Sequence, residues 1–255
     1  MRALITNDDG IMSEGLAVLA ASAVEAGYEV VVAAPARESS GASASLLGAE
    51  KDGRLVVESV RAPGLPDGVT SLAVRAAPAL IAFVAAYGGF GPKPDLVLSG
   101  VNKGANTGNA VLHSGTVGAA LSATTHGITS VAVSIDAAAP THWDTARRVT
   151  DHGLAWATSH DLAGRVLNLN VPDLPLDRVR GLRQAPLATF GAVSARIHQD
   201  DDRNLTLRYT GTDASGEPES DAGLLVRGWA TATLLRAPFA DVSAVFPGFG
   251  PVAGQ

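Results

Sequence analysis

Short apolar runs alternate with segments of helical spacing along the first two thirds of the chain. The runs are rich in Val, Leu, Ile and Ala and are expected to form buried strands at residues 3–6, 28–34, 96–99, 127–134 and 165–172. The intervening segments at residues 13–26, 77–88, 114–125 and 142–162 are expected to form helices. This alternation predicts an α/β fold with a doubly wound, mostly parallel, Rossmann-like sheet in a three-layer arrangement.

The alternation breaks at two places. Residues 54–60 and 71–76 alternate in strand fashion around a Pro/Gly-rich turn, which predicts a β-excursion. From residue 173 onward prolines interrupt the chain, and strand-like runs follow at 178–182, 193–197, 205–209 and 222–235, with an acidic turn at 200–202. The chain is therefore expected to divide into a catalytic α/β core (1–172) and a β-rich region of antiparallel hairpins and tail (173–255). Because isolated hairpins are marginal in water, the second region is expected to mediate oligomerisation.

Composition narrows the class of protein. Of the 255 residues, 46% are hydrophobic and 17% charged, which is typical of a globular protein with an ample core. The net charge is −6 and there is no basic run, so no nucleic-acid partner is expected. The absence of Cys excludes disulfides and thiolate metal sites. Neither a signal-like start nor an apolar run of about 20 residues is present, so no membrane partner and a cytoplasmic location are expected.

Two adjacent carboxylates, Asp8 and Asp9, follow the first predicted strand and precede Gly10. Open α/β sheets bind their ligands at the carboxyl ends of the strands. Adjacent ionised carboxylates repel each other unless a cation lies between them, and hard oxygen ligands suit Mg²⁺, Mn²⁺ or Ca²⁺. The pair is therefore a candidate metal site, and the alternative is a solvated Asp-Gly turn.

Further polar segments follow other strand ends. A Ser-rich loop at residues 36–45 follows the second strand, and a Gly-rich loop carrying Asn102 follows the strand at 96–99. Ser114-Gly115-Thr116 then opens a helix, where free N–H groups and the helix dipole favour an anion; an ordinary N-cap is the alternative. These segments are expected to converge at one sheet edge. A metal beside an anion pocket suits hydrolysis of a phosphate monoester.

Four segments in order resemble the SurE (survival protein E) family of metal-dependent 5′/3′-nucleotidases. They are residues 7–10 (NDDG), 40–43 (SGAS), 94–108 (PDLVLSGVNKGANTG) and 114–120 (SGTVGAA). Two departures from the family pattern are His113, where Tyr is usual, and Arg37-Glu38-Ser39, which replaces a basic, Asn-containing sequence.

The resemblance implies one divalent metal per subunit, Mg²⁺ or Mn²⁺, bound by Asp8, Asp9, Ser40 and Asn102, with Ser39 as the competing serine. It implies nucleoside monophosphate substrates and a homodimer or homotetramer joined through the C-terminal hairpins. The residues implied for phosphate binding are Asn102, Asn106, Ser114, Gly115 and Thr116.

Two questions stay open at the level of sequence. Asp8 and Asp9 are the candidate catalytic residues, either as base or nucleophile or only as ligands of a metal that activates water. The activity expected is hydrolysis of nucleoside 5′- and 3′-monophosphates. The alternatives are a nucleotide-binding regulatory protein with little turnover and a phosphatase for a non-nucleotide phosphate ester.

Overall fold

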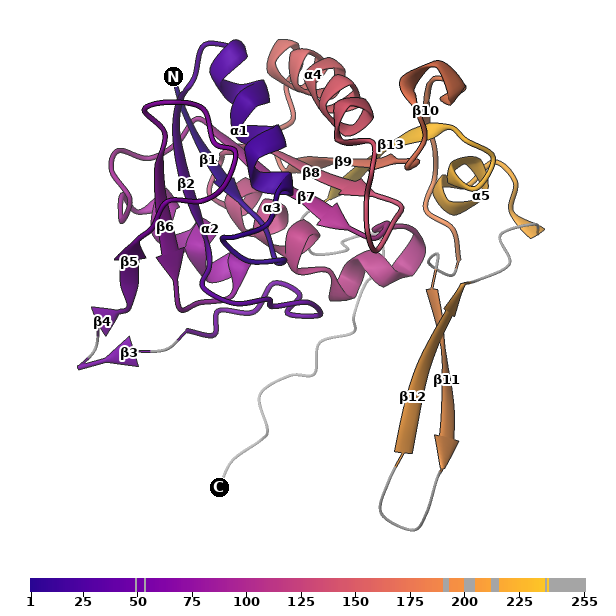
Figure 1. Cartoon of the computed structure of the whole chain (residues 1–255), viewed down its shortest axis with the longest axis horizontal. Helices are drawn as coiled ribbons and strands as arrows, with labels where there is room; N and C mark the ends of the chain where they lie inside the picture. The colour runs from indigo at the N-terminus through magenta and orange to yellow at the C-terminus, as the bar shows by residue number, and fades with distance from the viewer. Residues whose placement is uncertain are drawn as a thin grey trace, which may run out of the picture.

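The computed structural model describes residues 1–48, 50–52, 54–189, 193–199, 205–211, 216–236 and 238 (Figure 1). The acidic turn expected at 200–202 and the tail beyond residue 238 lie outside the described residues. In the described ranges, no helix combines the length and the apolar character that crossing a membrane requires.

A nine-stranded sheet forms the centre of the described structure, in the order β10-β13-β9-β8-β7-β1-β2-β6-β5. Its strands are β1 (Arg2–Thr6), β2 (Glu29–Pro35), β5 (Val57–Ser59), β6 (Thr70–Val74), β7 (Leu96–Lys103), β8 (Thr129–Ile135), β9 (Arg165–Val171), β10 (Leu182–Gln184) and β13 (Ala230–Arg236). The six strands from β9 to β6 are parallel, whereas β5 and β13 run antiparallel to β6 and β9. The predicted doubly wound, mostly parallel fold is confirmed.

Helices cover both faces of the sheet, as the alternation of β1 side chains requires. Ala3 and Ile5 belong to a core shared with α1 (Gly15–Glu25) and α4 (Trp143–Ser159). Leu4 points to the opposite face, into a core shared with α2 (Pro78–Ala86) and α3 (Gly115–Thr125). Since successive strand residues face opposite sides, both layers are fixed by one buried strand.

Several boundaries differ from the sequence expectation. β6 belongs to the main sheet beside β2, not to an excursion, and only the short β5 returns antiparallel to it. The run at 222–235 is not a hairpin: it contains α5 (Asp221–Leu225) and then β13, which pairs with β9. A 3₁₀ turn, η2 (Leu176–Arg178), takes part of the run expected as a strand at 178–182. The main sheet therefore continues past residue 172.

Two small hairpins lie outside the main sheet. β11 (Val193–Gln199) and β12 (Leu205–Gly211) pair antiparallel, as predicted, and Figure 1 shows them as a long arm extending from the body. β3 (Glu50–Lys51) and β4 (Arg54–Leu55) form the other pair. The role of the arm in oligomerisation stays a prediction.

Candidate metal and phosphate site

The turn after β1 is held by Asn7. Its side-chain oxygen accepts a hydrogen bond from the N–H of Gly10, and its amide donates to the Gly10 carbonyl, both at 3.1 Å. Gly10 has a φ of +97°, a region that residues with a Cβ rarely adopt. Asn7 is fully buried, so the turn presents Asp8 and Asp9 from a rigid base.

Asp8 is anchored to the first turn of α3. The Thr116 N–H donates to Oδ2 at 3.1 Å, and the Thr116 hydroxyl donates to Oδ1 at 2.5 Å. A Cβ on Gly115 would lie 2.8 Å from both Cβ and Oδ2 of Asp8, so only glycine permits this approach. The helix start that the sequence marked as an anion site thus already holds one anion of the protein itself.

Burial disfavours the ionised form of both Asp8 and Asp9. Burial raises the pKa of Asp8, and the hydrogen bonds from Thr116 oppose that rise. Burial and then the neighbouring charge of Asp8 raise the pKa of Asp9 to about 6, against the hydrogen bond from Lys103. In the part of the chain that the structure describes, neither carboxylate forms an ion pair. A cation bound beside them would relieve the strain between the two charges.

The end of β7 reaches the same place. β7 continues through Asn102 to Lys103, further than the strand expected at 96–99, with a register shift against β8. The Lys103 N–H donates to Oδ2 of Asp9 at 3.3 Å. The Asn102 amide donates to the Gly104 carbonyl at 2.7 Å, which leaves its oxygen for a ligand.

The Ser-rich loop closes the site from the β2 side. The Ser39 N–H donates to the backbone oxygen of Asp8 at 2.7 Å, which ties the loop to the end of β1. A cavity of about 580 Å³ is lined by Asp9, Ser40 and Lys103, together with residues of the loops after β1 and β2. Of the two serines only Ser40 lines this cavity, and among the other candidate ligands Asp8 and Asn102 do not line it.

Asn106 is held by polar side chains that the sequence analysis did not assign. Its N–H donates to Oδ1 of Asn170 at 2.7 Å, and its carbonyl accepts from Asn168 at 2.9 Å and from Asn170 at 3.0 Å. Its amide donates to the Ser134 hydroxyl at 2.8 Å. Asn168 and Asn170, at alternate positions of a predicted core strand, could have indicated this contact, because asparagine side chains are rarely buried without hydrogen-bond partners.

Ser114 is the N-cap of α3. Its hydroxyl oxygen accepts from the Val117 N–H at 3.0 Å, as in an ordinary capped helix. The preceding His113 has an exposed side chain. The helix start therefore serves as an ordinary capped end and as the anchor of Asp8.

The donor set fits a hard divalent cation. No group of three or more His, Cys, Asp or Glu side chains with metal-binding geometry occurs among the described residues. The candidate set instead combines two carboxylates with a hydroxyl and an amide oxygen, which suits Mg²⁺ or Mn²⁺ rather than a softer metal.

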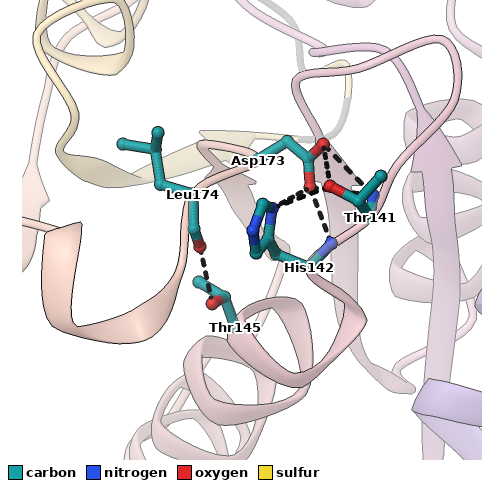
Figure 2. Close-up of polar contacts among 5 residues, drawn as sticks. All are labelled: Thr141, His142, Thr145, Asp173 and Leu174. Atoms are coloured by element: carbon teal, nitrogen blue, oxygen red, sulfur yellow. Dashed lines mark hydrogen bonds and ion pairs between the residues drawn. The ribbon is translucent and has the colours of Figure 1, made fainter.

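A second polar cluster lies beyond the ends of β8 and β9 (Figure 2). The Asp173 carboxylate accepts from the His142 N–H at 2.8 Å, from His142 Nδ1 at 3.0 Å and from the Thr141 N–H at 3.1 Å. Burial raises the pKa of Asp173, but these hydrogen bonds outweigh it and hold the pKa below its usual value. Thr145 donates to the Leu174 carbonyl at 2.8 Å, so the cluster fastens the start of α4 to the loop after β9.

Comparisons with known proteins agree with the residue pattern. The model of the family described as "Survival protein SurE" matches residues 3–192. A 5′/3′-nucleotidase SurE of Erwinia tasmaniensis is 37% identical over 92% of this chain and 90% of its own length. A 5′-nucleotidase SurE of Aeromonas hydrophila is 36% identical over 88% and 85%.

The fold agrees with a solved structure as well. The SurE protein of Aquifex aeolicus superimposes with a TM-score of 0.78, covering 94% of this chain and 95% of that one, at 24% identity. At 24% identity this structural similarity supports only the fold. The family model and the relatives at 36% and 37% identity support membership of the family. This chain therefore belongs to the SurE family.

Proposed function

We propose that this chain is a divalent-metal-dependent nucleotidase that hydrolyses nucleoside 5′- and 3′-monophosphates to nucleoside and phosphate. The observation that carries the proposal is the Asp8–Asp9 pair, held at the carboxyl edge of the sheet by the first turn of α3 and by the end of β7. Relatives named as nucleotidases, at 36% to 37% identity over most of the chain, support the same activity.

The residues divide into those that hold a cation and those that face the phosphate. Asp8, Asp9, Ser40 and Asn102 would hold Mg²⁺ or Mn²⁺. Such an ion, when bound, polarises a phosphoryl oxygen and activates water for attack.

On the phosphate side, the Ser114 hydroxyl and the side chains of Asn102 and Asn106 would orient the substrate oxygens, whereas the Thr116 N–H and hydroxyl already donate to Asp8. Lys103 adds positive charge at the cavity wall. These groups stabilise the charge on the phosphoryl oxygens and do not themselves exchange protons.

Asp9 is the better candidate of the two carboxylates for moving a proton. Both oxygens of Asp8 accept hydrogen bonds from Thr116, whereas Asp9 accepts one from Lys103 and borders the cavity. Asp8 then acts as an anchored ligand.

The experiment is an assay of phosphate release from a panel of 5′- and 3′-nucleoside monophosphates with Mn²⁺, with Mg²⁺ and with EDTA. Release is expected only with metal, and Asp9→Asn is expected to lower it by about 100-fold or more. Asp67→Asn is the matched control, because Asp67 is exposed on a distant loop.

The outcomes separate the competing functions. Binding of nucleotide without release would favour a regulatory protein. Release from other phosphate esters but from no nucleotide would favour the non-nucleotide phosphatase. Release that persists fully in EDTA would remove the metal from the proposal.

We also propose that the chain assembles into a homodimer or homotetramer through the β11–β12 arm. A two-stranded hairpin is marginally stable on its own, which supports a packing partner. Light scattering on the unmodified chain and on a variant lacking the arm tests this. The same number of subunits in both proteins would contradict the proposal.

A further inference from the structure

Glu38 contacts the serine that we propose as a metal ligand. The Ser40 hydroxyl donates to Oε1 of Glu38 at 2.7 Å. We propose that Glu38 is a positioning residue for the metal site. By accepting a hydrogen bond from the Ser40 hydroxyl, it directs the lone pairs of that oxygen toward the ion. This inference rests on the metal site of the proposed function, and goes beyond it in assigning a residue outside the ligand set.

The two adjacent serines have different partners. Ser39 donates its hydroxyl to the Arg37 carbonyl at 3.3 Å, and its N–H holds the backbone of Asp8. Ser40 and Glu38 instead line the cavity that contains Asp9. Ser39 therefore stabilises the loop, whereas Ser40 lines the cavity and donates a hydrogen bond to the Glu38 carboxylate.

The chemistry of a hydroxyl ligand requires such a partner. A serine hydroxyl is a weak neutral ligand, and it binds a cation only when its proton points away from the ion. A carboxylate that accepts this proton fixes the orientation, and the charge-assisted hydrogen bond increases the electron density on the oxygen. Partners of metal ligands of this kind typically change metal affinity by about 10- to 100-fold when removed.

Glu38 also acts on the site through its charge alone. Glu38 and Lys103, which carry opposite charges, line the same cavity as Asp9. A negative charge near a cation site increases cation affinity whether or not it touches a ligand. The proposal therefore needs a test that separates the effect through Ser40 from the direct effect of charge.

The experiment measures Mn²⁺ binding without substrate, from the electron paramagnetic resonance signal of free Mn²⁺. The proteins compared are the unmodified chain, the single variants Glu38→Ala, Glu38→Gln and Ser40→Ala, and the double variant Glu38→Ala/Ser40→Ala. Glu58→Gln is the matched control, because Glu58 is an exposed glutamate of β5 that pairs with Arg75 at 3.3 Å and contacts neither Ser40 nor Asp9 through any hydrogen bond or ion pair in the described residues.

Glu38→Ala is expected to weaken Mn²⁺ binding about 10-fold. Glu38→Gln is expected to weaken it less, because an amide oxygen still accepts the Ser40 proton. In the Ser40→Ala background, removal of Glu38 is expected to weaken Mn²⁺ binding by much less than in the unmodified chain, because only the effect of its charge remains, so that the two changes are non-additive. Glu58→Gln is expected to bind as the full chain does.

Three results would overturn the inference. Unchanged Mn²⁺ binding in Glu38→Ala would show that Glu38 does not support the site. Equal losses with and without Ser40 would show that Glu38 acts by charge alone. Absence of Mn²⁺ binding in the full chain would refute the proposed metal site itself, which distinguishes that failure from the first two.

Discussion

The hydroxyl of Thr116 lies 2.5 Å from Oδ1 of Asp8 and joins the first turn of α3 to the end of β1. Both residues are buried, and the backbone N–H of Thr116 adds a second hydrogen bond to the same carboxylate. The orientation of one candidate ligand is therefore set by a helix that begins more than a hundred residues later in the chain.

Thr116→Val is expected to reduce Mn²⁺ affinity and phosphate release about 10- to 100-fold. A hydrogen bond to a charged group contributes roughly 1.5–3 kcal/mol, and the isosteric Val removes only the hydroxyl bond. Thr125→Val is the control: Thr125 is exposed on the same helix and donates to the Ser122 carbonyl. Equal Mn²⁺ affinity in the two variants would contradict the role of Thr116.

Metal affinity is expected to rise with pH and to level off above about pH 7. The pKa of Asp9 is raised to about 6, and a cation competes with the proton on that carboxylate. Titrations with Mn²⁺ between pH 5 and 8 measure this dependence. In Asp9→Asn the weaker binding that remains is expected to vary less across the same range, and an identical slope in both proteins would reject the assignment.

Without metal, the stability contributed by Asp9 is expected to fall as pH rises. Its folded pKa lies above its unfolded value, so the folded state binds the proton more tightly; that stabilisation is complete below the unfolded pKa and is lost as pH rises through about 6. Urea unfolding of the metal-free chain and of Asp9→Asn measures the difference. The chain is expected to lose stability relative to the variant between pH 4 and 7, and saturating Mn²⁺ is expected to reverse this.

Asn170→Ala is expected to destabilise the loop that carries Asn106. Asn170 satisfies both the N–H and, with Asn168, the carbonyl of Asn106, and an unsatisfied buried polar group costs about 1–3 kcal/mol. The expected result is a lower urea midpoint together with a raised KM for nucleotide. Asn109→Ala is the control, since Asn109 is exposed and donates only to the Thr189 carbonyl in the described structure. A normal KM in Asn170→Ala would separate the loop from substrate binding.

Asp221→Ala is expected to lower the free energy of unfolding by about 3 kcal/mol. The carboxylate is fully buried and accepts from the N–H groups of Gly108, Ala188 and Ala222, each of which would lose its partner. Burial raises the pKa of Asp221 despite these bonds. Asp177→Ala, at the exposed start of η2, is the comparison, and a similar small change in both variants would contradict this role.

The sequence predicted those helices and strands whose pattern of apolar residues is contained within a single segment. The apolar runs of β1, β8 and β9 are buried on both faces, and α4 keeps a clear apolar stripe, so local patterns located each of them. The run at 222–235 was expected to belong to an antiparallel hairpin, whereas its second half forms β13 beside β9. Pairing between β13 and β9 joins residues 61 (Thr231 and Asn170) to 71 (Arg236 and Arg165) positions apart, which no local pattern encodes.

The candidate site divides in the same way. Positions at strand ends, such as Asp8 and Asn102, followed from the order of the elements. The hydrogen bonds of Thr116 with Asp8 and of Ser40 with Glu38 needed the tertiary structure, because each depends on a side-chain direction. Thr116 was predicted to contact phosphate, and the structure shows it occupied with a carboxylate of the protein.

The position of β13 between β9 and β10 sets the order in which the sheet is completed during synthesis. β10 leaves the ribosome first, yet in the described part of the chain its only sheet neighbour is β13. Until residues 230–236 have emerged, β9 is an open edge with unpaired backbone groups, which invites pairing with other chains. A nascent chain whose synthesis pauses before β13 therefore exposes the backbone of β9, a strand that lies inside the sheet of the folded protein.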